Sequence, residues 1–88
     1  MSYALVWTEP AMTEYRKLRG QDRPGAKTVS DAVRGLAIDP QPAGTRQLGS
    51  TEFRRMRVGA FRILYRLDEE ASAVIVEHVG RIPGGRAD

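Results

Sequence analysis

The sequence predicts an α+β fold with the element order β-α-α-β-β-β. We expect an antiparallel sheet of about four strands, mixed at the first strand, with a two-helix hairpin packed on one face. Three observations predict this fold. Apolar residues recur at helical spacing in two adjacent segments of the N-terminal half. β-Branched and aromatic residues dominate residues 53–82. A glycine-containing turn and an acidic turn divide that region into successive strands.

The N-terminal segment predicts a short strand followed by an amphipathic helix. Residues 3–7, Tyr-Ala-Leu-Val-Trp, alternate aromatic and aliphatic side chains, as a short strand does. Thr8 is suited to cap the helix that follows, because Glu9 and Pro10 are both favourable in a first helical turn. We expect this helix to end near Gly20. Its apolar residues recur at i, i+3 and i+6: Met12, Tyr15 and Leu18.

A second helix is expected to begin at Asp22 and Pro24. Pro40 should end it, because a proline restricts the preceding residue, Asp39, to extended conformations. The segment 40–44, Pro-Gln-Pro-Ala-Gly, has the composition of a loop. The apolar stripe of this second helix consists of Ala26, Val29, Val33 and Leu36.

The C-terminal half predicts the remaining strands. Residues 45–49 are a candidate for a short edge strand. Two longer strands follow, joined by a tight turn at 58–60, where Gly59 can adopt the dihedral angles that such turns need. An acidic turn at 68–70 leads into the last strand, residues 72–82. Its apolar residues occupy both faces, as expected of a central strand.

Composition indicates a single domain, residues 1–82, with a flexible tail at 83–88. Hydrophobic residues make up 41% of the 88 residues, as in ordinary globular chains. The absence of cysteine excludes disulfides and cysteine-based zinc sites. No apolar run approaches the roughly 20 residues that cross a bilayer, and the N-terminus lacks the features of a signal peptide. We therefore expect a cytoplasmic protein without membrane contact.

Basic charge is concentrated in one part of the chain. The formal net charge is +3 and the sequence pI is about 9.8, which favours an anionic partner. Residues 46–66 contain six arginines against one acid, whereas residues 67–88 have a net charge of −3. Twelve of the fourteen basic residues are arginine, so the positions of the arginines are more informative than their number.

Strand alternation predicts that four arginines project from the sheet face that the helices leave open: Arg55, Arg57, Arg62 and Arg66. The opposite face, which includes Tyr65, is expected to pack against the helices. Residues two apart on one strand are about 6–7 Å apart, and neighbouring strands are about 5 Å apart, so the guanidinium groups repel one another unless an anion binds. Guanidinium geometry matches phosphate oxygens. The alternative is a solvated face on which Glu52 and Glu77 pair with some of these arginines.

Five short motifs occur in order in the C-terminal half: Leu48-Gly49, Arg55-Met56-Arg57-Val58-Gly59, Phe61-Arg62-Ile63-Leu64-Tyr65, Asp68-Glu69-Glu70 and Val79-Gly80-Arg81. Together they resemble the C-terminal half of toxins of the RelE/ParE superfamily. The first strand and the basic segment Tyr-Arg-Lys-Leu-Arg-Gly of the first helix also fit, so the resemblance covers nearly the whole chain. It implies a bacterial toxin of a type II toxin–antitoxin system, with a cognate antitoxin as partner and contact to operator DNA only through that antitoxin.

Within the superfamily the sequence is most similar to the RelE-like branch. This resemblance implies a ribosome-dependent mRNA interferase, with the ribosome and mRNA as partners. Such enzymes cleave mRNA in the ribosomal A site by attack of a ribose 2′-OH on the adjacent phosphodiester. The matching catalytic positions are Arg55, Arg57, Arg62 and Arg81. Substrate binding is assigned to three further arginines: Arg46, Arg54 and Arg66. Strand alternation turns Arg54 away from the proposed site.

Proton transfer is the step for which this sequence departs from the RelE-like pattern. Where those enzymes commonly have lysine, this chain has Arg55 and Arg57, and arginine is a poor general base because it stays protonated. The C-terminal tyrosine or histidine of the pattern is absent. His78 and Glu77 are the candidates for an acid or base. Strict alternation places His78 on the face opposite Arg81 and Glu77 on the same face as Arg81.

Two other functions fit the superfamily. A ParE-like toxin acts on a protein target such as gyrase and leaves RNA intact. A catalytically decayed homologue keeps its antitoxin and loses its toxicity. Under every interpretation we expect no metal and no organic cofactor, because one histidine without cysteine does not supply a ligand set. Cleaved mRNA distinguishes the first function from these two.

Overall fold

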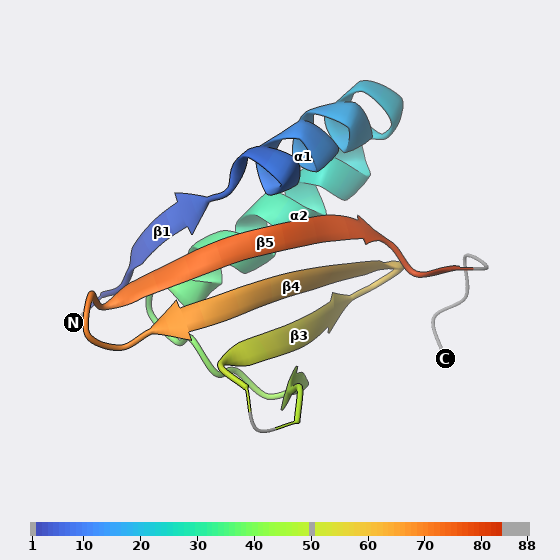
Figure 1. Ribbon diagram of the computed structural model, residues 1–88. Helices are drawn as coiled ribbons and strands as arrows, with labels where there is room; N and C mark the ends of the chain where they lie inside the picture. Colours follow the sequence, from blue (N-terminus) through green and yellow to red (C-terminus); the bar gives the residue numbers. More distant parts are fainter. Residues whose placement is uncertain (1, 50, 84–88) are drawn as a thin grey trace.

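The computed structural model describes residues 2–49 and 51–83, which form five strands and two helices (Figure 1). The predicted flexible tail lies outside these residues except for Pro83. The α+β class and the element order are confirmed. The sheet has five strands instead of about four, because the candidate edge strand at 45–49 does form a strand. The elements are β1 (Ala4–Trp7), α1 (Glu9–Gln21), α2 (Arg23–Leu36), β2 (Thr45–Gln47), β3 (Phe53–Val58), β4 (Phe61–Asp68) and β5 (Ala73–Arg81).

The five strands form one mixed sheet in the order β1-β5-β4-β3-β2. β1 pairs with β5 in parallel, and the other neighbouring strands pair antiparallel, which confirms that the sheet is mixed at its first strand. β2 is the edge strand at the other end of the sheet. Figure 1 shows α2 crossing behind the sheet and α1 lying along β5, so the front face of β3 and β4 stays uncovered.

Side-chain caps begin both helices. Thr8 Oγ1 accepts a hydrogen bond from the Ala11 amide at 3.2 Å, and Asp22 Oδ1 accepts one from the Gly25 amide at 2.9 Å. Each cap satisfies a backbone donor that has no partner within its own helix. The Thr8 cap was predicted from sequence, and the start of the second helix at Asp22 was predicted as well.

The end of α2 differs from the prediction. The helix stops at Leu36 rather than just before Pro40. The Ala37 amide donates to the Arg34 carbonyl, three residues earlier, at 3.1 Å. This bond closes a tighter turn than the bonds of an α-helix, which span four residues. The amides of Ile38 and Asp39 then both donate to the Gly35 carbonyl. The chain has therefore left the helix before the proline can restrict it.

The core lies between the helices and one sheet face. All four residues of the predicted α2 stripe are buried, and burying each of the larger ones contributes about 1.5–3 kcal/mol. Tyr65 is the largest fully buried side chain, which confirms its predicted packing role. On α1, Leu18 is buried and Tyr15 packs edge-on against Trp7 with 5.3 Å between ring centroids. The strands contribute Met56, Phe61, Ile63, Val74, Val76 and Val79 beside Tyr65.

A β-bulge interrupts the alternation of β5. Leu64 pairs with His78, but the next residue, Tyr65, pairs with Val76, so Glu77 has no partner across the strand. Glu77 and His78 consequently both lie on the open face, where Leu64 also lies. Strict alternation gave Glu77 the same face as Arg81, and that prediction was wrong because sequence spacing does not reveal the extra residue.

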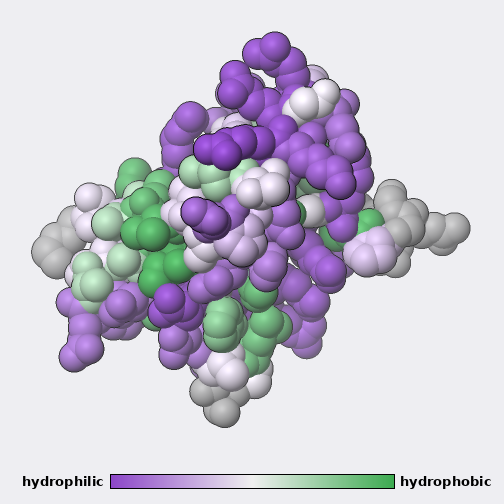
Figure 2. All heavy atoms as spheres, turned by 45° about the horizontal axis from the view of Figure 1, so that its top comes forward, coloured by the Kyte–Doolittle hydropathy of each residue, from purple (hydrophilic) through white to green (hydrophobic). Residues whose placement is uncertain are grey.

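Hydrophilic side chains cover the outer surface of α1 in Figure 2, as expected for an amphipathic helix with one buried side. The same figure shows an apolar patch beside the N-terminal strand. Val6 of β1 is 47% exposed. Within the part of the chain that the structure describes, neither helix is long and apolar enough to cross a membrane.

Candidate functional site

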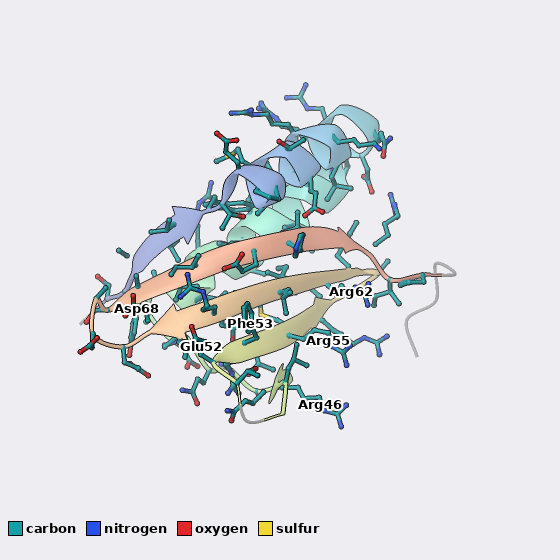
Figure 3. All side chains as sticks on the ribbon, viewed as in Figure 1. Arg46, Glu52, Phe53, Arg55, Arg62 and Asp68 are labelled. Atoms are coloured by element: carbon teal, nitrogen blue, oxygen red, sulfur yellow. The ribbon has the colours of Figure 1, made fainter. Side chains whose placement is uncertain are left out.

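Four arginines on the open sheet face stand opposite one another in two neighbouring rows. Arg46 of β2 is opposite Arg55 of β3, and Arg57 of β3 is opposite Arg62 of β4. Directly opposed residues on paired strands have Cβ atoms about 5 Å apart, so the register sets side chains of like charge next to one another. Figure 3 shows Arg46, Arg55 and Arg62 on three neighbouring strands, with Arg46 and Arg55 extending toward the same end of the sheet. The four residues are named the arginine cluster.

Within the part of the chain that the structure describes, no acidic side chain neutralises the arginine cluster. None of the salt bridges among residues 2–49 and 51–83 includes any of the four side chains. Arg46, Arg57 and Arg62 are exposed, and Arg55 is half-buried. The prediction that alternation brings Arg55, Arg57 and Arg62 to one face is confirmed by their register. The result is a concentrated positive potential on an accessible surface.

Arg66 lies on the same face but is neutralised. Its Nε is 3.1 Å from Glu77 Oε2, and its Nη1 is 3.3 Å from Glu52 Oε2. The hydrogen bond to Glu77, and then that to Glu52, raises the pKa of the Arg66 guanidinium above its ordinary value. Arg66 and its two carboxylates form a self-contained ionic group, so its charge is not free for a substrate phosphate.

Arg54 lies on the helix-facing side of β3, where Tyr65 is its partner across the strands. Its Nη2 donates to Thr45 Oγ1 at 3.1 Å, and its Nε is buried without a hydrogen-bond partner. The adjacent Tyr65 hydroxyl donates to the Pro40 carbonyl at 2.7 Å. Arg54 therefore packs under the β2–β3 edge, away from the arginine cluster.

A cavity of about 420 Å³ opens beside the cluster, at the meeting point of β3, β4, β5 and α1. Gly80 of β5 is opposite Arg62, and a Cβ at Gly80 would meet no atom within 4 Å, so this position leaves the cavity open. The walls are both basic and apolar, and they contain one carboxylate and one imidazole. The lining residues are Glu14, Leu48, Arg55, Arg62, Leu64, His78, Val79, Gly80 and Arg81.

Arg81 reaches this cavity from the end of β5. It pairs with Phe61, whose side chain is buried on the helix-facing side, so Arg81 starts from the face opposite Arg62. Arg81 Nη2 is 2.8 Å from Asp22 Oδ2, and its guanidinium carbon is 5.1 Å from the centroid of the Phe61 ring. The ion pair and the cation–π contact hold Arg81 at the rim of the cavity.

His78 lines the cavity and contacts Glu14, which was not among the predicted site residues. Glu14 of α1 places Oε2 at 3.2 Å from His78 Nδ1, and Glu14 Oε1 accepts a hydrogen bond from the Val79 amide at 3.0 Å. One sequence signal could have indicated Glu14. It lies three residues after Ala11 and four before Leu18, both buried, so an acid occupies the apolar stripe of α1.

A family described as the ParE toxin of type II toxin–antitoxin systems matches residues 5–81, which is most of the chain. The chain belongs to the RelE/ParE superfamily of toxins. A comparison with curated proteins finds no significant match to this toxin.

Solved structures share the fold of the toxin. The isolated E. coli RelE toxin has a TM-score of 0.81 and 20% identity, over 99% of this chain and 89% of its own. The RelBE2 toxin–antitoxin complex of Mycobacterium tuberculosis has a TM-score of 0.79 and 21% identity, over 93% of this chain and 100% of its own. A mutant E. coli RelE bound to a peptide of the antitoxin RelB has a TM-score of 0.70 and 26% identity, over 96% of this chain and 87% of its own.

The toxin thus has a site with abundant fixed positive charge and one imidazole. Guanidinium groups bind and stabilise phosphate charge, whereas imidazole is the side chain suited to proton transfer. In residues 2–49 and 51–83, no group of three or more histidine, aspartate or glutamate side chains could hold a metal ion. The chemistry that these residues can support is binding and polarisation of a phosphodiester.

Proposed function

We propose that this toxin is a ribosome-dependent endoribonuclease that cleaves mRNA in the ribosomal A site. The observation that carries the proposal is the arginine cluster, whose four guanidinium groups form no salt bridge among the described residues. Opposed like charges on paired strands are unfavourable, and a bound polyanion relieves their repulsion. RNA supplies one negative charge at each nucleotide, at a spacing that several arginines can follow.

The proposed reaction is attack of a ribose 2′-OH on the adjacent phosphodiester. Negative charge on the phosphoryl oxygens grows as the new bond forms, so cations that are already in place stabilise the transition state more than the ground state. We assign this role to Arg55 and Arg62, which line the cavity, and to Arg57 beside them. Arg81 would contact the same phosphate from the rim, and Arg46 would bind a neighbouring phosphate of the strand.

We further propose that a cognate antitoxin neutralises the toxin. RelE proteins of known structure occur as complexes with RelB antitoxins. An acidic antitoxin segment that covers the arginine cluster would remove the repulsion and block RNA at once. In this proposal operator DNA is contacted through the antitoxin, and the toxin acts in the cytoplasm, where ribosomes are.

One observation favours a second function. The family that matches the chain is described as the ParE toxin of the parDE system, while the similar folds include RelE toxins. A ParE-like toxin that inhibits gyrase would use its surface to bind a protein and would leave mRNA intact. We prefer the nuclease because Arg55 and Arg62, which form no salt bridge among the described residues, line an open cavity rather than a flat contact surface.

The first prediction separates these functions. Induction of the wild-type toxin should arrest translation and produce new mRNA 5′ ends inside codons on stalled ribosomes. Arg62→Ala should lower cleavage by about 10²–10³-fold, because it removes one preorganised cation from the transition state. The measurement is sequencing of mRNA 5′ ends before and after induction, with the antitoxin repressed.

Arg34→Ala is the matched control, because Arg34 is an exposed α2 residue that pairs with Asp31 outside the cavity. It should cut as well as the wild type. Growth arrest with intact mRNA would refute the nuclease proposal. If DNA damage accompanied that arrest, it would support the gyrase-type function instead.

A further inference from the structure

We propose that Glu14 and His78 are the proton-transfer pair of the toxin, with His78 as the general base and Glu14 as its positioning residue. This inference rests on the RNA cleavage proposed above. It supplies the group that the arginines cannot provide, since guanidinium stays protonated at neutral pH. A histidine oriented by a carboxylate is also the arrangement that activates hydroxyl nucleophiles in other enzymes.

Glu14 is fixed by the backbone of β5. β1 pairs with β5 only as far as Trp7 and Val76. Beyond that point β5 keeps β4 on one edge, and α1 runs along its other edge, where no strand continues β1. There Glu14 Oε1 accepts a hydrogen bond from the Val79 amide at 3.0 Å and replaces the carbonyl acceptor that another strand would supply. The same carboxylate is 3.2 Å from His78 Nδ1 through Oε2 and 3.3 Å through Oε1. The contact therefore has a fixed geometry.

This contact determines which ring nitrogen of His78 is available. A carboxylate next to an imidazole nitrogen is favourable only if that nitrogen carries a proton, because two lone pairs repel. Glu14 therefore holds the proton on Nδ1 and leaves the lone pair on Nε2. When Nε2 accepts a proton, the same carboxylate stabilises the resulting imidazolium.

The β-bulge places His78 within reach of a phosphate bound by the arginines. His78 is opposite Leu64, and Leu64 is opposite Arg55, so all three lie in one row across the open face. His78 and Arg55 are two strands apart, about 10 Å, which leaves room for a ribose and its phosphate between them. The charged groups around the imidazole are Glu14 from α1, Arg55 from β3, Arg62 from β4 and Arg81 from β5.

The proposed step is balanced in atoms and charge. Nε2 of His78 takes the proton of the ribose 2′-OH while the 2′-oxygen forms a bond to phosphorus. The bond from phosphorus to the 5′-oxygen breaks, and that oxygen takes a proton from water. The hydroxide produced then removes the proton from the imidazolium. The products are a 2′,3′-cyclic phosphate and a 5′-hydroxyl, and His78 is regenerated.

The test measures single-turnover cleavage of mRNA on programmed ribosomes as a function of pH. The wild-type rate should rise with pH over the range in which an imidazole loses its proton and then level off. His78→Ala should lower the plateau by about 10²-fold or more, remove that rise, and recover activity when free imidazole is added. Glu14→Gln should lower the rate by at least about 10-fold, because an amide can donate to Nδ1 and leave the proton on Nε2.

Glu9→Gln is the matched control for Glu14→Gln, because it makes the same charge change on the same helix outside the cavity. It should keep the wild-type rate and pH profile. Nitrogen-15 NMR of the imidazole gives a second measurement that needs no RNA: Nδ1 should carry the proton in the wild type, and Nε2 in Glu14→Gln. If Glu14→Gln does not fold, the exposed His78→Gln substitution tests the same base.

The outcomes separate this inference from the proposed function. If the wild type cuts and Arg62→Ala does not, but His78→Ala and Glu14→Gln cut at the wild-type rate with the same pH profile, the proton-transfer pair is wrong and the nuclease stands. A proton on Nε2 in the wild type would also overturn the pair. If the wild type leaves mRNA intact on programmed ribosomes, both proposals fail.

Discussion

At the scale of single residues, Tyr65 combines deep burial with one polar contact. Its side chain is fully buried, and its hydroxyl donates to the Pro40 carbonyl at 2.7 Å. This bond ties the loop after α2 to the centre of the sheet. Burial, the largest cause, raises the pKa of the phenol above 10.0, although Thr45 and Arg54 act in the opposite direction.

We predict that Tyr65→Phe lowers the free energy of unfolding at neutral pH by about 0.5–1.5 kcal/mol, the usual contribution of one hydrogen bond. The lower part of that range is expected, since Pro40 is half-buried and water can replace the lost donor. Unfolding in urea near neutral pH provides the measurement. A loss well above this range would mean that the hydroxyl does more than bind Pro40.

The same substitution has a second expected effect in alkali. The folded-state pKa of Tyr65 lies above its unfolded value, so its contribution is fully present below pH 10.0 and is lost as the pH rises through the folded value. The wild type should therefore lose more stability than Tyr65→Phe between neutral pH and about pH 11. Parallel losses in the two proteins would show that burial of Tyr65 does not govern this dependence.

Residue identity alone did not distinguish the arginines. Arg66 is neutralised by Glu52 and Glu77, and Arg54 packs on the helix side, although both were predicted to bind substrate. Alternation correctly indicated the face of each, because it is a local property of a strand. Partners such as Glu77 depend on which strands are neighbours, and the bulge that turns Glu77 toward Arg66 leaves no mark in the spacing.

At the scale of elements, the junction of α1 and α2 connects the helical hairpin to the site. Asp22 caps α2 through Oδ1 and holds Arg81 through Oδ2. Gly25 permits this arrangement: a Cβ there would lie 2.5 Å from the tip of the Phe61 ring and would also collide with the Asp22 carboxylate. The short helix connection thus positions one cavity residue from the far end of the chain.

We predict that Gly25→Ala destabilises the toxin by about 1–3 kcal/mol, since the methyl group must displace the Phe61 ring or the Asp22 cap. Gly35→Ala is the matched control in the same helix, because nothing lies within 4 Å of its added Cβ. It should stabilise the protein by up to about 1 kcal/mol through helix propensity. Thermal unfolding of both variants compares them, and equal shifts would contradict the steric argument.

The elements themselves were largely predictable. Both helices and their caps follow from local sequence, since Thr8 and Asp22 act on residues within the next turn. The open-face arginines of the candidate site were predictable, whereas the contact between Glu14 and His78, which spans 64 residues, was not. No periodicity indicates which point of β5 will meet α1, because that depends on how the helix packs against the sheet.

At the scale of the whole molecule, the concentration of positive charge on one face should lower the free energy of unfolding of the free toxin. The open face holds the arginine cluster, and none of the salt bridges among the described residues includes any of its four side chains. Charges arranged for binding commonly reduce the stability of the free protein. An anionic partner should therefore stabilise the fold in proportion to its affinity, because it binds the folded state alone.

The opposed pair Arg57 and Arg62 provides the test of this expectation. We predict that Arg57→Gln raises the free energy of unfolding by about 0.2–1 kcal/mol at low salt, because it removes a like-charge contact between paired strands. The gain should shrink in about 0.5 M salt, where screening weakens the repulsion between exposed charges. RNA affinity should fall in the same variant, with a less steep dependence on salt concentration.

Arg66→Gln makes the same substitution on the same face and should have the opposite effect. It breaks the contacts to Glu52 and Glu77, so it should destabilise the protein at low salt and leave RNA binding nearly unchanged. Urea unfolding at two salt concentrations and RNA titration compare the two variants directly. If Arg57→Gln destabilised the fold as Arg66→Gln does, the arginine cluster would not be under repulsion in the free protein. The central physical argument for an anionic substrate would then be lost.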